Sequence, residues 1–89
     1  MAVSTIKQIQ IMEFNKGNVT SNSSGMVNIS AELGVPITAR CVIAESLTSN
    51  IKVSTPIFWN GSFFVVVNDY NSGSPKANAS LSLQVAWVL

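Results

Sequence analysis

The chain contains no histidine and only one cysteine, Cys41. Without histidine, neither a Ser-His-Asp triad nor a Cys-His pair can form within one chain. The common zinc ligand sets are also incomplete. The only acidic side chains are Glu13, Glu32, Glu45 and Asp69, and their positions are typical of solvated charges on strand ends and polar strand faces. We therefore predict a protein that is not an enzyme and has no catalytic site, no metal site and no cofactor.

Disulfides are excluded within the chain, because Cys41 has no second cysteine to pair with. It lies in the apolar stretch 39–44, "ARCVIA", so we expect it to be a small buried residue. Charge is scarce as well: 10% of the residues are charged, the formal net charge is +1, and the five basic residues are scattered. Nucleic-acid binding relies on concentrated positive charge, so we expect no nucleic-acid partner.

Long apolar runs are also missing. The run at 63–67, "FFVVV", is far shorter than the roughly 20 residues that a membrane-spanning helix needs, so we expect no membrane partner. The stretch 1–14 lacks the continuous apolar segment of a signal peptide. We expect a chain that is made in the cytoplasm without a signal peptide. It either stays there or leaves the cell by lysis, as part of a particle or cut from a longer polypeptide.

What the sequence does contain is alternation with a period of two, which is typical of strands with one face in a core. In the last segment, Leu81, Leu83, Val85, Trp87 and Leu89 share one face, opposite Ser80, Ser82, Gln84 and Ala86. The segment 26–33 repeats the pattern, with Val27, Ile29, Ala31 and Leu33 on one side. Segments 51–59 and, more weakly, 5–14 alternate too, whereas 37–46 is mixed on both faces.

Turn residues separate these segments at 15–18, 21–25, 33–36, 47–50 and 68–75. No segment has a convincing helical period. The pattern predicts one all-β domain over 1–89, a small antiparallel sandwich or barrel of six or seven strands, in which 1–23 forms an N-terminal strand and loop.

The clearest local signal is Asn60-Gly61, which separates two apolar β-forming segments. Both residues tolerate the positive φ angles of a type I′ turn, so they predict a two-residue hairpin. The expected register pairs Trp59 with Ser62, Phe58 with Phe63 and Ile57 with Phe64. Pro56 cannot donate a ladder hydrogen bond, so we expect it at an edge or a bulge.

Both faces of this hairpin are apolar, and both should therefore be covered. A small sandwich covers only one face, so the other favours an oligomer interface. The predicted interface residues are Phe58, Phe63, Phe64, Val65, Val66 and Val67. The alternative is a tight barrel in which a long loop or the N-terminal strand covers that face.

The same region suggests a carbohydrate site. Trp59 and Tyr70 could stack on sugar rings, and Asn71 lies beside Tyr70 in an Asn/Asp/Ser/Gly-rich loop that could bind hydroxyls. These three residues are the predicted ligand contacts. The alternative is that Trp59 belongs to the core or an interface, and that the loop is a solvated connection.

The layout of 24–89 resembles a small β-sandwich domain found at the end of tail, baseplate and receptor-binding proteins of phages and prophages of Gram-positive bacteria. The shared features are a Gly-Val-Pro turn at 34–36, a "TSN" turn at 48–50, a strand ending in Trp59 before Asn60-Gly61, a Ser/Gly/Asn-rich connection at 71–75 and the ending "VAWVL". The chain departs from the pattern in having Trp87 where similar domains tend to carry Tyr.

The resemblance implies a structural or adhesion module of the virion tail that forms a homo-oligomer, since such modules often stand in threefold assemblies, and we expect a trimer. Its partners would be other tail proteins and host cell-surface polysaccharide. Two other functions agree with the residues: a standalone carbohydrate-binding module, and a particle decoration protein without a ligand.

Overall fold

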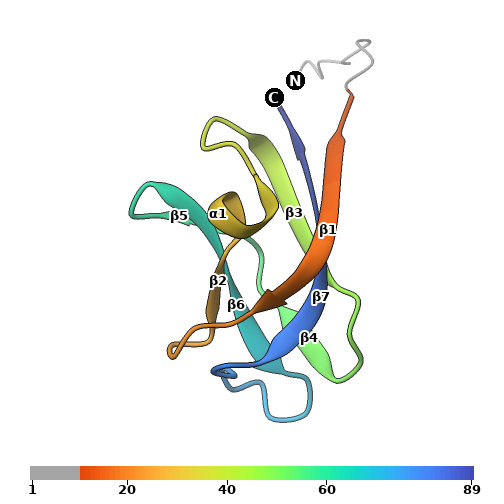
Figure 1. Ribbon diagram of the computed structural model, residues 1–89, viewed down its shortest axis with the longest axis vertical. Coiled ribbons are helices and arrows are strands. Elements are labelled where there is room, and N and C mark those ends of the chain that lie inside the picture. Colours follow the sequence, from red (N-terminus) through yellow and green to blue (C-terminus); the bar gives the residue numbers. More distant parts are fainter. Residues whose placement is uncertain (1–10) are drawn as a thin grey trace, which may run out of the picture.

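A computed structural model describes residues 11–89, which form an antiparallel β-sandwich (Figure 1). The elements in chain order are β1 (Glu13–Thr20), β2 (Met26–Asn28), α1 (Ile29–Leu33), β3 (Arg40–Ser46), β4 (Ile51–Val53), β5 (Ile57–Trp59), β6 (Ser62–Asp69) and β7 (Ser80–Val88). One sheet has the strand order β1-β7-β3, and the other has the order β2-β6-β4, with β5 also paired to β6. The predicted all-β fold class is confirmed.

The core lies between the inward faces of the two central strands, β6 and β7. The alternation predicted for β7 is confirmed for Leu81, Leu83, Val85 and Trp87, each of which is 6% exposed or less. Leu89 lies beyond the strand and is exposed. From the opposite sheet, Val65 and Val67 are fully buried against this row.

The segment 26–33, predicted as one strand, is strand only as far as Asn28 and then turns into the short helix α1. The Asn28 side chain accepts a hydrogen bond from the Ala31 N–H (3.0 Å), and Gly34 ends the helix with φ of 70°. These are favoured capping residues. A strand and a helix both place residues i and i+4 on one face, so the burial of Ile29 and Leu33 agrees with either conformation. Ala31 distinguishes the two, because a strand would turn it inward with Ile29 and Leu33, whereas it is exposed. No helix within residues 11–89 is long and apolar enough to cross a membrane.

The turn predicted at 15–18 is also wrong, because these residues lie inside β1. This strand pairs with β7 without a break, from Glu13↔Trp87 to Thr20↔Ser80. Gly17 serves packing here: a Cβ at this position would lie 3.3 Å from the Leu33 side chain, so its absence lets α1 approach the strand. The strand expected over 5–14 lies mostly outside the described residues. Within them, β1 begins at Glu13.

Cys41 is exposed rather than buried. The β3–β7 register shifts between Arg40 and Ile43, so that Cys41 and Val42 together occupy the space opposite Trp87. Cys41 has φ of 53°, which is uncommon outside glycine. The bulge directs this extra residue to solvent while Val42 packs against the core.

The region around Pro56 behaves as predicted. Strand β6 pairs first with β4, ending at Val53↔Val67, and then with β5, beginning with Ile57↔Phe64. Three residues lie between Val53 and Ile57, but only two lie between Phe64 and Val67, so the β4–β5 side has one extra residue. Ser54 bridges the irregularity, with its N–H donating to the Val66 carbonyl and its hydroxyl accepting from the Val66 N–H (3.0 and 2.9 Å).

Candidate interaction site

The β5–β6 hairpin presents large apolar side chains on its surface. Its turn residues Asn60 and Gly61 have φ of 50° and 82°, as a type I′ turn requires. The predicted register is confirmed at all three pairs, from Ile57↔Phe64 to Trp59↔Ser62. Figure 1 shows this hairpin projecting at one side of the sandwich, next to α1.

Each face of the hairpin carries one edge-to-face aromatic pair. The rings of Phe58 and Phe63 have centroids 5.0 Å apart with an interplanar angle of 69°, and those of Trp59 and Phe64 lie 5.4 Å apart at 67°. Such pairs stabilise their geometry beyond simple burial. The hairpin is therefore held in shape by its own side chains as well as by its turn.

The end of the hairpin is apolar and exposed. Ile57 is 46% exposed, and Phe58 and Trp59 are each 56% exposed. No charged residue occurs between Lys52 and Asp69. We call the segment 57–64 the aromatic arm. Three consecutive large apolar side chains in contact with water are unfavourable by the hydrophobic effect, so they mark a surface that gains free energy when it is covered.

Helix α1 supports the arm at its base. The Ser30 hydroxyl accepts a hydrogen bond from the Phe63 N–H (3.0 Å), and the Phe63 ring packs partly against the core. The arm is therefore connected to the sandwich by a hydrogen bond and by core packing as well as by the chain itself.

Two of the predicted interface residues are excluded by the structure. Val65 and Val67 are fully buried between the sheets, so they cannot contact a partner in the folded chain. The alternation along β6 turns them inward as the strand passes from the arm into the sandwich. Phe58 is exposed, and Phe63, Phe64 and Val66 are half-buried.

The three predicted ligand residues do not form one site. Trp59 pairs with Ser62 at the start of β6, whereas Tyr70 follows the last residue of that strand. Eight residue rises, from Ser62 to Tyr70, separate the two positions, about 26 Å. No single sugar ring can stack on both aromatic side chains.

The loop that holds Tyr70 and Asn71 is ordered by its own hydrogen bonds. The Asn71 N–H donates to the Asp69 carboxylate (3.0 Å), and the Tyr70 N–H donates to the Asn50 carbonyl (3.0 Å). The Tyr70 ring is 65% exposed, and the Lys52 Nζ lies 5.9 Å from its centroid. This loop is a separate, polar surface with one exposed aromatic ring.

The outer face of the β1-β7-β3 sheet carries an apolar row that the sequence does not predict. Phe14 and Ile43 both lie opposite Ala86, one on each side of it, and they are 64% and 56% exposed. Ala86 itself is buried between them. The mixed polarity of 37–46 is the one local signal of this row, but the pairing that joins three distant segments is not visible in the sequence.

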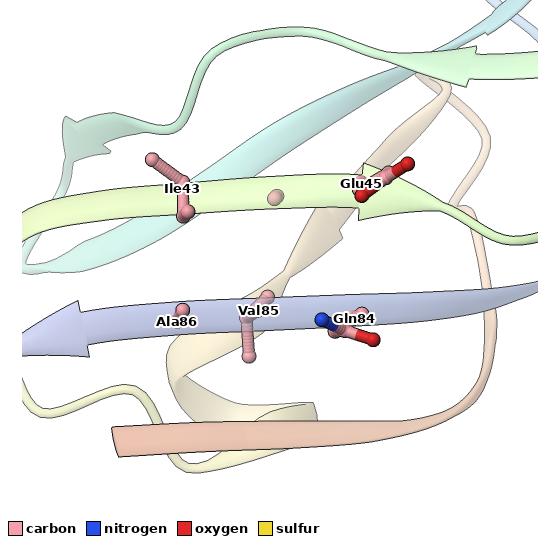
Figure 2. Close-up of a pocket in the computed structure, with 6 residues that line it drawn as sticks. Ile43, Glu45, Gln84, Val85 and Ala86 are labelled. Atoms are coloured by element: carbon pink, nitrogen blue, oxygen red, sulfur yellow. The ribbon is translucent and has the colours of Figure 1, made fainter. Parts of the chain in front are cut away.

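A shallow depression of about 260 Å³ lies along β3 and β7 on this sheet (Figure 2). Its lining residues are Ile43, Ala44, Glu45, Gln84, Val85 and Ala86. Figure 2 shows Ile43 and Ala86 at one end and the Glu45 carboxylate and the Gln84 amide at the other.

Within residues 11–89, no three His, Cys, Asp or Glu side chains gather in a way that could hold a metal ion. Comparisons with protein-family models, with curated proteins and with solved structures found no match to the chain.

Proposed function

We propose that this chain is a non-enzymatic structural and adhesion module that forms a homo-oligomer through its aromatic arm. The observation that carries the proposal is the exposure of Ile57, Phe58 and Trp59 on a rigid, uncharged hairpin. Association with further copies would cover this surface, and most soluble oligomers are homo-oligomers with closed symmetry.

We propose that this module belongs to the tail tip or tail fibre of a phage or prophage of a Gram-positive bacterium, and that it assembles there as a trimer. The support for this location is the resemblance of 24–89 in layout, together with the uncharged polar composition. In this setting the other tail proteins hold the module, and host-surface polysaccharide is its external ligand. A tail location predicts that the chain is recovered with purified virus particles.

The experiment that tests the oligomer is the solution mass by light scattering on a size-exclusion column. We expect the wild-type mass to be a multiple of the chain mass, three for a trimer, and Trp59→Ser to give a folded monomer. Tyr70→Ser is the matched control, because it removes another exposed aromatic ring, 65% exposed against 56% for Trp59, at the other end of β6. We expect this control to leave the mass unchanged.

A monomeric wild-type chain would overturn the oligomer proposal and favour a standalone carbohydrate-binding module. An assembly that binds no polysaccharide would favour a decoration protein. Phe64→Ser adds a second test, because it removes the ring that supports Trp59. An unchanged, soluble assembly of this variant would count against the arm as the interface.

A further inference from the structure

The chain has a second exposed apolar surface, and it lies on the other sheet from the aromatic arm. The arm belongs to the β2-β6-β4 sheet through the pairing of β5 with β6, whereas the Phe14-Ala86-Ile43 row lies on the outer face of β1-β7-β3. The sandwich core separates the two surfaces. One copy therefore cannot cover its own apolar row with its own arm.

One surface projects from the sandwich and the other is a depression in it. The projecting arm carries the Trp59 side chain, which is more than half exposed (Figure 1). The depression between β3 and β7 is concave, with Ile43 and Ala86 forming its apolar end (Figure 2). An indole ring is a large, flat apolar group that gains free energy when it is covered.

The two surfaces are complementary in hydrogen bonding. The indole N–H of Trp59 is a donor only, and it belongs to a side chain that solvent reaches. The polar end of the depression offers the Glu45 carboxylate, which is an acceptor only, and the Gln84 amide oxygen. A hydrogen bond from the indole N–H to a carboxylate is charge-assisted and stronger than a neutral one.

We propose a head-to-tail contact in which the aromatic arm of one copy docks into the β3–β7 depression of the next copy. Trp59 packs against the exposed Ile43 side chain, beside the buried Ala86, and its N–H donates to the Glu45 carboxylate. This inference rests on the proposed function, since it needs the arm to drive assembly, and it adds the receiving surface. Because the two sides of the contact differ, it is heterologous, and three copies that close on themselves form a ring.

The test uses one variant for each side of the contact. Trp59→Ser removes the arm's anchor and leaves the depression intact. Ile43→Glu places a charge in the depression and leaves the arm intact. We expect each variant alone to be monomeric. An equimolar mixture is expected to form a heterodimer, because the arm of the Ile43→Glu copy meets the intact depression of the Trp59→Ser copy.

Three results would overturn the proposal. If Ile43→Glu remains assembled like the wild type, the depression does not receive the arm, and the proposed function survives without this inference. If both variants are monomeric and their mixture stays monomeric, arm and depression are not partners. If the wild type is monomeric, the inference and the proposed oligomer both fail. Asn18→Glu, a charge on the same sheet outside the depression, is the control and keeps the wild-type mass.

The hydrogen bond has its own test. Trp59→Phe removes the N–H but keeps an apolar ring, and Glu45→Ala removes the acceptor. We expect each to weaken assembly about tenfold, as for one hydrogen bond to a charged group. The double variant should be no weaker than either single variant. Additive losses would show that Trp59 and Glu45 do not contact each other.

Discussion

The ring of Trp59 meets that of Phe64 edge to face, with centroids 5.4 Å apart, although Trp59 is 56% exposed. The two residues are not directly opposite each other, since Trp59 is opposite Ser62 and Phe64 is opposite Ile57. It therefore links the two strands of the arm diagonally. The arm keeps its shape before any partner binds, so association does not have to order it first.

This pair should make a measurable contribution to stability. We predict that Trp59→Leu and Phe64→Leu are coupled by about 0.5–1.5 kcal/mol in a double-mutant cycle of urea unfolding. The measurement should be made at a concentration where the chain is monomeric, so that association does not contribute. A coupling near zero would show that the two rings do not hold each other in solution.

Gly25 is predicted to be intolerant of any side chain. Its φ is 78°, and an added Cβ would lie 3.0 Å from the Pro75 Cβ and 3.1 Å from the Lys76 nitrogen. Gly25→Ala should lower the free energy of unfolding by more than about 1 kcal/mol. Gly73→Ala is the matched control, because Gly73 has a similar φ of 72° but nothing within 4 Å of its added Cβ. Equal losses for the two variants would contradict the close packing at Gly25.

The cap of α1 can be tested separately from its packing. Asn28→Ala removes the side chain that accepts from the Ala31 N–H, and we expect a loss of about 1 kcal/mol in chemical denaturation. Asn28→Asp keeps an acceptor at this position and should restore most of the loss. If Asn28→Ala has the stability of the wild type, then the segment 29–33 does not depend on this cap.

Trp87 is buried, yet its indole N–H has no hydrogen-bond partner within residues 11–89. An unpaired buried donor costs about 1–3 kcal/mol, which offsets part of what the ring gains by packing. We predict that Trp87→Phe changes the free energy of unfolding by less than about 1.5 kcal/mol. Leu83→Ala, in the same buried row, should cost about 2–5 kcal/mol. A loss at Trp87→Phe as large as at Leu83→Ala would contradict the unpaired N–H.

Polysaccharide binding, where it occurs, should depend on Tyr70 and not on Trp59. The two rings lie at opposite ends of β6 and cannot share one ligand ring. We expect Tyr70→Ala to abolish saturable binding of host-wall polysaccharide in titration calorimetry, while Asn71→Ala weakens it and Glu32→Ala, an exposed control, leaves it unchanged. Loss of binding with Trp59→Ala in a chain that remains assembled would move the ligand site to the arm.

Some features can be predicted from the sequence because their causes are local. The hairpin at Asn60-Gly61 depends on two residues that accept positive φ and on the strands next to them, so both its turn and its register follow from the sequence. The inward face of β7 follows as well, because a period of two sustained over nine residues is typical of a strand and does not suit a helix. The interruption of strand pairing around Pro56, between β4 and β5, agrees with the proline, which lacks an N–H.

Tertiary structure decided the rest, because contacts between distant segments chose between locally acceptable conformations. The spacing of Ile29 and Leu33 suits a strand or a helix equally. In the folded chain the segment is the helix α1, which packs against β1 and β6. The segment 15–18 has the composition of a turn but is strand, because β7 pairs with it throughout. The apolar row of Phe14, Ala86 and Ile43 exists only once three separate strands are aligned, so the mixed polarity of 37–46 indicates an exposed apolar side chain but not the row.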